Sequence, residues 1–237
     1  MIELEQINKS FGTGSLRVQA LHDINLQILH GEIIAVTGPS GAGKSTLLHV
    51  MAGLLPPSSG RLFIDGWDMI NGHDAKQTTF RRRNIGFVFQ NFNLIPTLTA
   101  EENLLLPALA DGEVDPSLAH RTAIELLSRL GLRTRKNNFP GTLSGGEQQR
   151  TAIARAMMMR CLLKRKGGLL LADEPTGNLD SANASHVCKM MVELCREYDT
   201  SLVIATHDPM VAQFADRQFA MKDGELTEKP LVVSCKS

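Results

Sequence analysis

The strongest constraint on the fold is a short glycine-rich loop, Gly38-Pro39-Ser40-Gly41-Ala42-Gly43-Lys44-Ser45, which matches every fixed position of the phosphate-loop pattern G-x-x-x-x-G-K-S/T. It follows a β-branched apolar run over 33–37, which is typical of a buried parallel strand. A helical pattern begins at Lys44 and ends near Gly53. Strand, loop and helix in this order predict an α/β fold whose loop wraps a phosphate chain with backbone N–H groups. Chance occurrence is the alternative, and the flanking elements disfavour it.

Composition narrows the class of protein. The chain has 237 residues, enough to bury a sizeable core, and its 25 Lys and Arg balance 25 Asp and Glu, so no net charge attracts nucleic acid or an anionic membrane. We interpret the clusters 81–83 and 164–166, all Lys or Arg, as solvated faces rather than polyanion sites. No leader pattern opens the chain, and its apolar runs are shorter than the roughly 18 residues that span a bilayer. We therefore expect a soluble protein.

The cysteines give no sign of a metal site or a disulfide framework. The four cysteines, at positions 161, 188, 195 and 235, form no C-x-x-C pair and have no metal-ligand spacing. They fit buried thiols in a reducing cytosol.

The chain reads as one α/β body interrupted by a helical segment. We expect strands near 2–7, 24–29, 33–37, 61–65, 85–89, 169–172 and 201–206, and a helix near 182–198. Residues 91–159 look helical, with a capping box at Thr99 and an N-cap at Asp115 before Pro116. The prediction is a single domain over 1–228, with a phosphate-loop NTPase core of mixed sheet (about 1–90 and 160–228), an inserted α-helical subdomain (about 91–159) and a flexible tail over 229–237.

Two further strands end in groups that suit phosphate chemistry. Asp173 and Glu174 follow the apolar run 169–172, so they lie where open α/β folds bind ligands. There Asp173 can hold Mg²⁺ through water and Glu174 can polarise an attacking water. The alternative is a strand that simply enters a polar turn. His207 likewise ends the strand LVIAT, and taken alone it fits a histidine satisfied at a strand tip.

A second candidate anion site lies at Leu143–Arg150, LSGGEQQR. Ser144 and Glu147 form a capping-box pattern, and Gly145-Gly146 sit at the start of the helix with free backbone N–H groups. We call the phosphate loop and the helix start Ser144–Gly146 the first and second cradle. One chain cannot sensibly use both cradles on one nucleotide. The alternative is a well-capped helix that binds nothing.

Together these motifs resemble a known family. Phosphate loop, Gln90 after IGFVF, LSGGEQQR, LLLADE, the turn 178–180 and His207 occur in the order seen in ATP-binding cassette (ABC) nucleotide-binding domains, over roughly residues 2–227. There is no N-K-x-D motif that would argue for a GTPase. The stretches FVFQNFNLIPTLTAEEN and LADEPTGNLDS are similar to the lipoprotein-release and macrolide-efflux branch (LolD, MacB and YbbA types).

The resemblance implies a set of roles. Two such domains would face head to tail as a homodimer, each ATP lying between one phosphate loop and the partner's Ser144, Gly145 and Gly146, with Asp180 near the seam. Gly38 to Thr46, that is Gly38, Pro39, Ser40, Gly41, Ala42, Gly43, Lys44, Ser45 and Thr46, would cradle the phosphates. Ser45, Gln90 and, through water, Asp173 would hold Mg²⁺. Glu174 would orient or deprotonate the water, and His207 would contact the γ-phosphate. Phe11 stands where the family often stacks a ring on adenine, and it fits a core residue equally well.

The implied function is an ATP hydrolase, with ATP and Mg²⁺, that drives a separate integral membrane permease from the cytoplasmic face of the cell membrane, without nucleic acid. Apolar residues of 90–109 (Phe92, Leu94, Ile95, Leu98) suggest the docking surface, unless they only pack the helical segment. The alternatives are a soluble ABC ATPase of DNA repair or translation, disfavoured by neutral charge and the single cassette, and an ATP-gated scaffold, disfavoured by Glu174.

One departure from the branch is the connection before the strand LLLAD, which reads MMMRCLLKRKGG over residues 157–168. This connection is about six residues longer than the compact one expected, and such insertions are tolerated when they run over the surface. The local course of the chain near 158–168 therefore stays open, and the site assignments do not depend on it.

Overall fold

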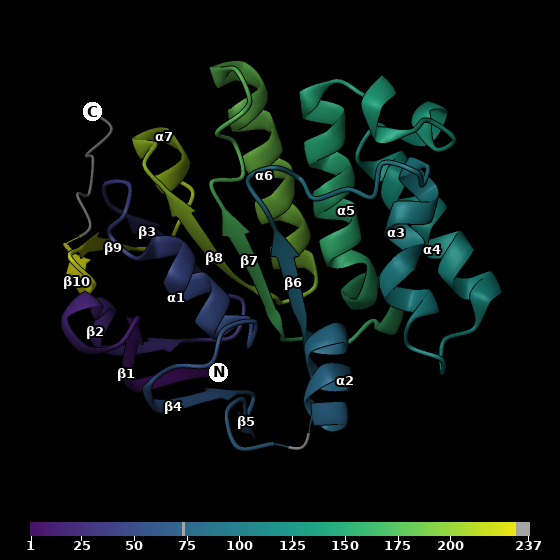
Figure 1. Cartoon of the computed structure of the whole chain (residues 1–237). Coiled ribbons are helices and arrows are strands. Elements are labelled where there is room, and N and C mark those ends of the chain that lie inside the picture. Colours follow the sequence, from purple (N-terminus) through teal and green to yellow (C-terminus); the bar gives the residue numbers. More distant parts are fainter. Residues whose placement is uncertain (73, 231–237) are drawn as a thin grey trace.

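The computed structural model describes residues 1–72 and 74–230, which form two sheets and their covering helices (Figure 1). The first sheet is antiparallel, in the order β2-β1-β4-β5. Its strands are β1 (Ile2–Phe11), β2 (Val18–Ile28), β4 (Ser59–Ile64) and β5 (Trp67–Asp68). β1 and β2 are much longer than the expected strands 2–7 and 24–29, and they form a long hairpin.

The second sheet carries the predicted site. Its order is β10-β9-β3-β8-β7-β6, with β9 to β6 parallel and β10 antiparallel, so the sheet is mixed as predicted. Its strands are β3 (Ile33–Thr37), β6 (Ile85–Val88), β7 (Leu169–Asp173), β8 (Ser201–Thr206), β9 (Arg217–Lys222) and β10 (Glu225–Lys229). Because β8 lies between β3 and β7, the ends of these three strands meet at one edge.

The helices gather on both faces of this sheet, with α3, α4 and α5 on the side of the molecule away from β1 and β2 (Figure 1). They are α1 (Lys44–Met51), α2 (Asp74–Asn84), α3 (Ala100–Leu109), α4 (Pro116–Arg129), α5 (Gly145–Leu163), α6 (Ser181–Glu197) and α7 (Pro209–Ala212). Three short 3₁₀ turns, Gly14–Leu16, Arg133–Arg135 and Pro140–Thr142, join them.

The six-stranded sheet separates two hydrophobic clusters, which explains why its central strands are apolar at every position except their ends. Ile34 and Val36 of β3 point to the cluster shared with the antiparallel sheet and α1, whereas Ile33 points to the cluster under α3 to α6. In β7, Leu169 and Leu171 alternate with Leu170 in the same way. A strand covered on both faces needs apolar side chains throughout.

The predicted helix boundaries are confirmed where capping chemistry defines them. Both capping boxes are formed: the Thr99 side chain accepts from the Glu102 N–H, and Ser144 from Glu147. Asp115 caps α4 by accepting from the Ser117 N–H at 2.9 Å. Gly53, with a φ of 65°, follows the end of α1.

Several elements escaped the sequence patterns. Helix α2 has only two apolar residues, Ala75 and Phe80, and only Gln77 is buried, so it has no apolar stripe. β9 and β10 form a hairpin in which Lys229 pairs with Gln218, so the expected tail begins one residue too early. Residues 231–237 lie outside the described part, and the division into core and helical subdomain stays a prediction.

Residues 158–168, whose course the sequence left open, begin as helix in the core. α5 continues to Leu163, and its residues 158–162 are buried; only 164–166 form an exposed turn. Arg160 is buried as well, and it donates to the Gly167 carbonyl at 3.2 Å and to Asn84 Oδ1 at 3.1 Å. Most of this connection is therefore core packing and not a surface loop.

The three cysteines that the structure describes are free and buried, as predicted. Burial raises the pKa of the Cys161 thiol to about 11 and that of Cys188 to about 12. Cys235 lies outside the described residues. Among the helices described, none has the length and apolarity needed to cross a membrane.

Candidate functional site

The phosphate loop contains two glycines, Gly38 and Gly43, whose positions leave no room for a side chain. Gly43 has a φ of 107° as the N-cap of α1, and a Cβ there would lie 2.5 Å from the Ala20 carbonyl oxygen. A Cβ at Gly38 would lie 2.1 Å from the Met221 carbonyl oxygen. Side chains at these positions would collide with backbone, so only glycine lets the loop curl over the start of α1.

Lys44 is the cation of this loop. Its side chain is nearly buried, and Nζ donates to the carbonyl oxygens of Gly38, at 2.8 Å, and Pro39, at 3.1 Å. The same Nζ lies 3.6 Å from Glu174 Oε1. The ammonium group is thus held under the loop with a carboxylate on its other side.

A cavity of about 280 Å³ joins the loop to the ends of the neighbouring strands. It is lined by Ala20, Ser40, Gly41, Gly43, Lys44, Ser45, Thr46, Gln90, Glu174 and His207. Nine of these ten were predicted site residues. Ala20 was not, because nothing in the sequence showed that β2 extends back to reach the loop.

Glu174 lies between the two basic side chains of the cavity. It directly follows β7 with a φ of 44°, and its N–H donates to the Ala205 carbonyl on β8 at 2.9 Å. Its Oε2 is 3.0 Å from His207 Nδ1. The Glu174 side chain is only 13% exposed and that of His207 is 70% exposed, so the carboxylate is fixed and the imidazole is open to solvent.

The neighbouring carboxylate suits a hydrated cation. Asp173 Oδ1 is buried and has no hydrogen-bond partner among the residues described. Ser45 and Gln90, which line the cavity, add the neutral oxygen donors that Mg²⁺ accepts beside waters and phosphate. The described part of the chain has no group of three His, Cys, Asp or Glu side chains able to hold a metal by itself. The donors therefore fit Mg²⁺ brought with a phosphate chain.

Gln90 is tied to the turn that precedes α6. Asn178 Nδ2 donates to the Gln90 carbonyl oxygen at 2.9 Å. Two residues further on, Arg155 of α5 donates to the carbonyls of Phe92, at 2.9 Å, and Asn93, at 2.6 Å. Desolvation lowers the pKa of this largely buried Arg155 guanidinium.

The second cradle lies apart from the cavity. Ser144, Gly145 and Gly146 begin α5 and do not line the cavity. They lie instead beside the turn before α6: a Cβ built on Gly145 would lie 3.7 Å from the Asn178 carbonyl oxygen and 3.8 Å from Leu179 Cδ2. Asp180 caps α6 there, its Oδ1 accepting from the Asn183 N–H at 3.0 Å. The structure thus places Gly145 beside the turn of Asp180, and a dimer seam at this place stays a prediction.

The glycines of this second cradle differ from those of the phosphate loop. Gly145 and Gly146 have ordinary helical φ values, and added Cβ atoms would meet nothing closer than 3.5 Å. Their own chain would accept a side chain at both positions.

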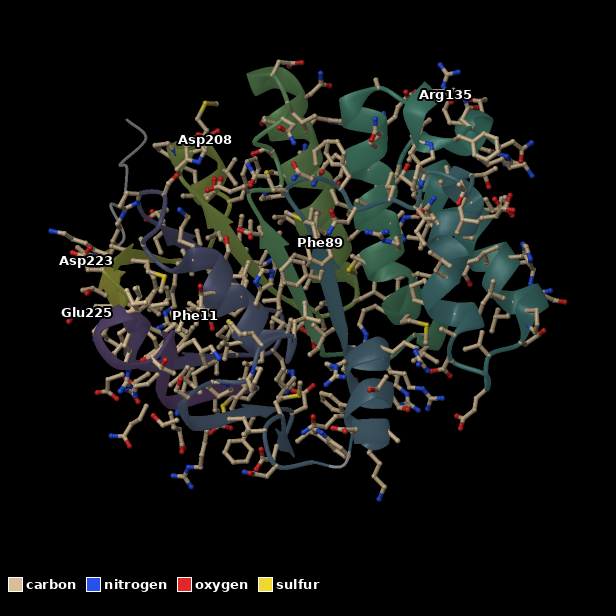
Figure 2. All side chains as sticks on the ribbon, in the orientation of Figure 1. Phe11, Phe89, Arg135, Asp208, Asp223 and Glu225 are labelled. Atoms are coloured by element: carbon tan, nitrogen blue, oxygen red, sulfur yellow. The ribbon has the colours of Figure 1, made fainter. Side chains whose placement is uncertain are left out.

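Phe11 is exposed at the end of β1. Its side chain is 44% exposed, and Lys9 Nζ lies 5.2 Å from its ring centroid. Figure 2 shows it on the hairpin side of the molecule, across from α3 and α4. The alternative that Phe11 is a core residue is wrong, and its stacking on adenine stays a prediction.

Comparison with known proteins agrees with this geometry. The sequence profile of the ABC transporter family matches residues 21–177. The chain is 42% identical over 226 residues to the lipoprotein-releasing system ATP-binding protein LolD of Shewanella oneidensis, covering 95% of each chain. It is 44% identical over 228 residues to the macrolide export ATP-binding/permease protein MacB of Marinobacter nauticus, covering 96% of this chain and 34% of that longer protein.

A solved structure shares the fold over almost the whole chain. It is the dimeric post-hydrolysis state of the ATP-binding cassette MJ0796 bound to ADP and Pi, with a TM-score of 0.86 and 38% identity. The match covers 98% of this chain and 99% of the other.

The contrast between the two glycine sites predicts different stabilities. Gly43→Ala should lower the free energy of unfolding by at least about 2 kcal/mol, because it adds a positive-φ penalty to a clash with the Ala20 carbonyl. Gly145→Ala should change it by less than about 1 kcal/mol, because the added methyl has room at a helical φ. Urea unfolding of both variants measures this. Equal destabilisation would show that Gly145 is required by its own chain.

Proposed function

The chain belongs to the ABC transporter family and is an ATP-hydrolysing protein of the LolD/MacB type, and from this we propose that it drives a separate membrane protein as an ATP-dependent head-to-tail homodimer. The observation that carries the proposal is the separation of the two cradles, one lined by Lys44 and Glu174 and the other at the start of α5.

In the hydrolytic step, Lys44 exchanges its carbonyl partners for the β- and γ-phosphate oxygens. Glu174, held by its backbone bond to β8, orients the attacking water and takes its proton. His207 lies on the other side of Glu174 and contacts the γ-phosphate. Mg²⁺, held by Ser45, Gln90 and, through water, Asp173, would neutralise phosphate charge. Ser40, Gly41 and Thr46 cradle the remaining oxygens, and Phe11 stacks on adenine.

Glu174→Gln should keep ATP binding and lower the turnover number at least about a hundredfold, because the amide cannot accept the proton of the water. Lys44→Ala should instead lose nucleotide affinity. Steady-state phosphate release and equilibrium binding of ATP measure the two effects. Near-normal hydrolysis by Glu174→Gln would remove Glu174 from this role.

The proposed dimer uses the helix start at Gly145 and Gly146. Their backbone N–H groups open a helix whose first turn carries a partial positive charge, and a Cβ added at either glycine would meet no atom of this chain closer than 3.5 Å. A γ-phosphate held by the phosphate loop of a second copy suits that space. ATP would then join the subunits, and hydrolysis would release them.

ATP should convert Glu174→Gln protein from monomer to dimer, and adding Gly145→Asp should prevent this. The new carboxylate would face the γ-phosphate, and two anions about 4 Å apart repel by roughly 4 kcal/mol at an effective dielectric near 20. Gly141→Asp is the matched control, because it makes the same change three residues before Ser144 where a side chain also has open space. Sedimentation with and without ATP measures the outcome. A dimer of the Gly145→Asp variant would contradict the proposal.

A mixture of two variants gives a sharper test. In a mixed dimer of Gly145→Asp and Lys44→Ala subunits, one composite site carries both lesions and the other carries neither. Each variant alone should be nearly inactive, and the mixture should regain ATPase activity. No recovery would show that the two cradles do not act across a seam.

The membrane partner is proposed to dock beside Gln90. Within 90–98, Phe92, Leu94 and Leu98 are half-buried and Ile95 is 40% exposed, so the segment both packs on the helices and presents an apolar side chain. A groove of about 330 Å³ lies next to it, lined by Arg82, Ile85, Gly86, Phe87, Phe89, Asn93, Pro107, Arg155, Ala156 and Met159. Figure 2 shows Phe89 just past the end of β6, between α1 and α5. The membrane protein docked there would hold this ATPase at the cytoplasmic face of the cell membrane.

Ile95→Glu should abolish copurification with an integral membrane protein while leaving basal ATP hydrolysis within about twofold, because it charges an exposed apolar side chain outside the cavity. Leu54→Glu is the matched control, since Leu54 is 56% exposed and follows α1. Affinity purification from detergent-solubilised membranes, with ATPase assays on the same samples, measures both. Partner retention by Ile95→Glu would place docking elsewhere, and loss of folding would assign Ile95 to the core.

A further inference from the structure

A second cavity, larger than the nucleotide cavity, lies where α4, α5 and α6 meet. Its volume is about 570 Å³, within the range of small-molecule sites. It is lined by Leu118, Arg121, Thr122, Glu125, Leu126, Arg129, Cys161, Lys164, Arg165, Lys166, Glu197 and Tyr198. No residue of the phosphate loop or of the second cradle belongs to it.

The lining is strongly basic although the chain as a whole is neutral. Five cationic side chains face two carboxylates, a net charge of +3, whereas the whole chain has 25 of each sign. Arg129 and Glu197 neutralise each other: Arg129 Nη1 donates to Glu197 Oε1 at 3.0 Å, and this bond lowers the pKa of the Glu197 carboxyl. Four cations, at 121 and 164–166, then remain against Glu125.

These four cations are not used by the fold. In the part of the chain described, none of their side chains makes a hydrogen bond or ion pair. The C-terminal ends of three helices offset part of this positive charge, because α4, α5 and α6 each contribute a last-turn or capping residue to the lining. Each terminus carries roughly −0.5 charge, so three offset about half of the net +3. The remainder concentrates a positive field in a concave site.

The apolar part of the lining further restricts which ligands fit this cavity. Leu118, Leu126 and the Tyr198 ring face the same space as the cations. A ligand that fits both needs an anionic group with several oxygens, which Arg and Lys bind well, and an apolar or ring-bearing portion. Phosphate esters combine the two.

We propose that this cavity binds a phosphate-bearing organic anion, held by Arg121, Lys164, Arg165 and Lys166 at a site separate from the nucleotide. The solvated turn expected at 164–166 is thus the rim of a binding site. Because the two cavities share no lining residue, the anion and a nucleotide bind at the same time.

Tyr198 provides a direct reporter, because it is the only tyrosine of the chain and it lines the cavity. Burial raises the pKa of its hydroxyl to about 12, so the ring stays neutral near pH 7. Full-length protein labelled with 3-fluorotyrosine should therefore show one fluorine resonance. The probes are inorganic pyrophosphate and dihexanoyl phosphatidic acid, each titrated with ADP in excess so that the phosphate loop is filled.

At least one probe should shift the Tyr198 resonance saturably, with a Kd below about 1 mM that weakens as salt is added. The triple variant Lys164→Gln, Arg165→Gln, Lys166→Gln should weaken binding at least about tenfold, and so should Arg121→Gln on the opposite wall. The control triple variant Arg61→Gln, Lys76→Gln, Lys189→Gln removes the same charge away from the cavity and should bind as the parent does. Retained ADP affinity verifies that each variant is folded.

The two probes separate the sources of the phosphate group. Binding of pyrophosphate alone supports a water-soluble phosphorylated compound, and tighter binding of the phosphatidic acid supports a lipid headgroup. Failure of both probes to shift the resonance overturns the proposal. Equal weakening by the two triple variants overturns it too, because net charge rather than this cavity would then explain the binding.

Discussion

The parallel pairing of β8 with β3 on one side and β7 on the other is the interaction on which the site depends. Thr37 pairs with Thr206, and Asp173 pairs with Ala205, so the ends of the three strands lie in register. The phosphate loop, Glu174 and His207 directly follow these ends. Residues far apart in sequence are thereby brought together: Lys44 Nζ lies 3.6 Å from Glu174 Oε1, 130 positions further along the chain, and Glu174 Oε2 lies 3.0 Å from His207 Nδ1.

The chemistry of the site was predictable because each motif is local. A phosphate loop carries its own geometry, and an apolar strand followed by carboxylates identifies its end. Ala20 was missed for the opposite reason: it reaches the loop only because β2 extends and pairs along β1, a contact between distant segments. The same holds for α2, whose sequence lacks any stripe, and for β9, which is a strand because β3 pairs with it.

The course of residues 158–168 could not be predicted from the sequence. Insertions are tolerated most easily where a connection runs over the surface. These residues instead continue α5, and Met158 and Cys161 enter the cluster that also holds Leu170. Nη1 and Nη2 of the buried Arg160 donate to the Gly167 and Asn84 oxygens, whereas its Nε has no hydrogen-bond partner among the described residues. Residues 157–162 are all buried, so this end of α5 lies within the core.

The segment after Gln90 connects the nucleotide cavity with α5, the helix that begins at Ser144–Gly146. Gln90 lines the nucleotide cavity with its side chain, while its carbonyl is held by Asn178 of the turn beside the second cradle. Phe92 and Asn93 follow with φ values of 61° and 48°, a conformation that costs a non-glycine residue roughly 1–2 kcal/mol. It persists because Arg155 of α5 donates to both of their carbonyls, and α5 begins at the second cradle. In the proposed dimer, a displacement of Gln90 by phosphate or of α5 by a partner subunit would therefore act on the same strained pair of residues. The exposed Ile95 follows that pair by two residues.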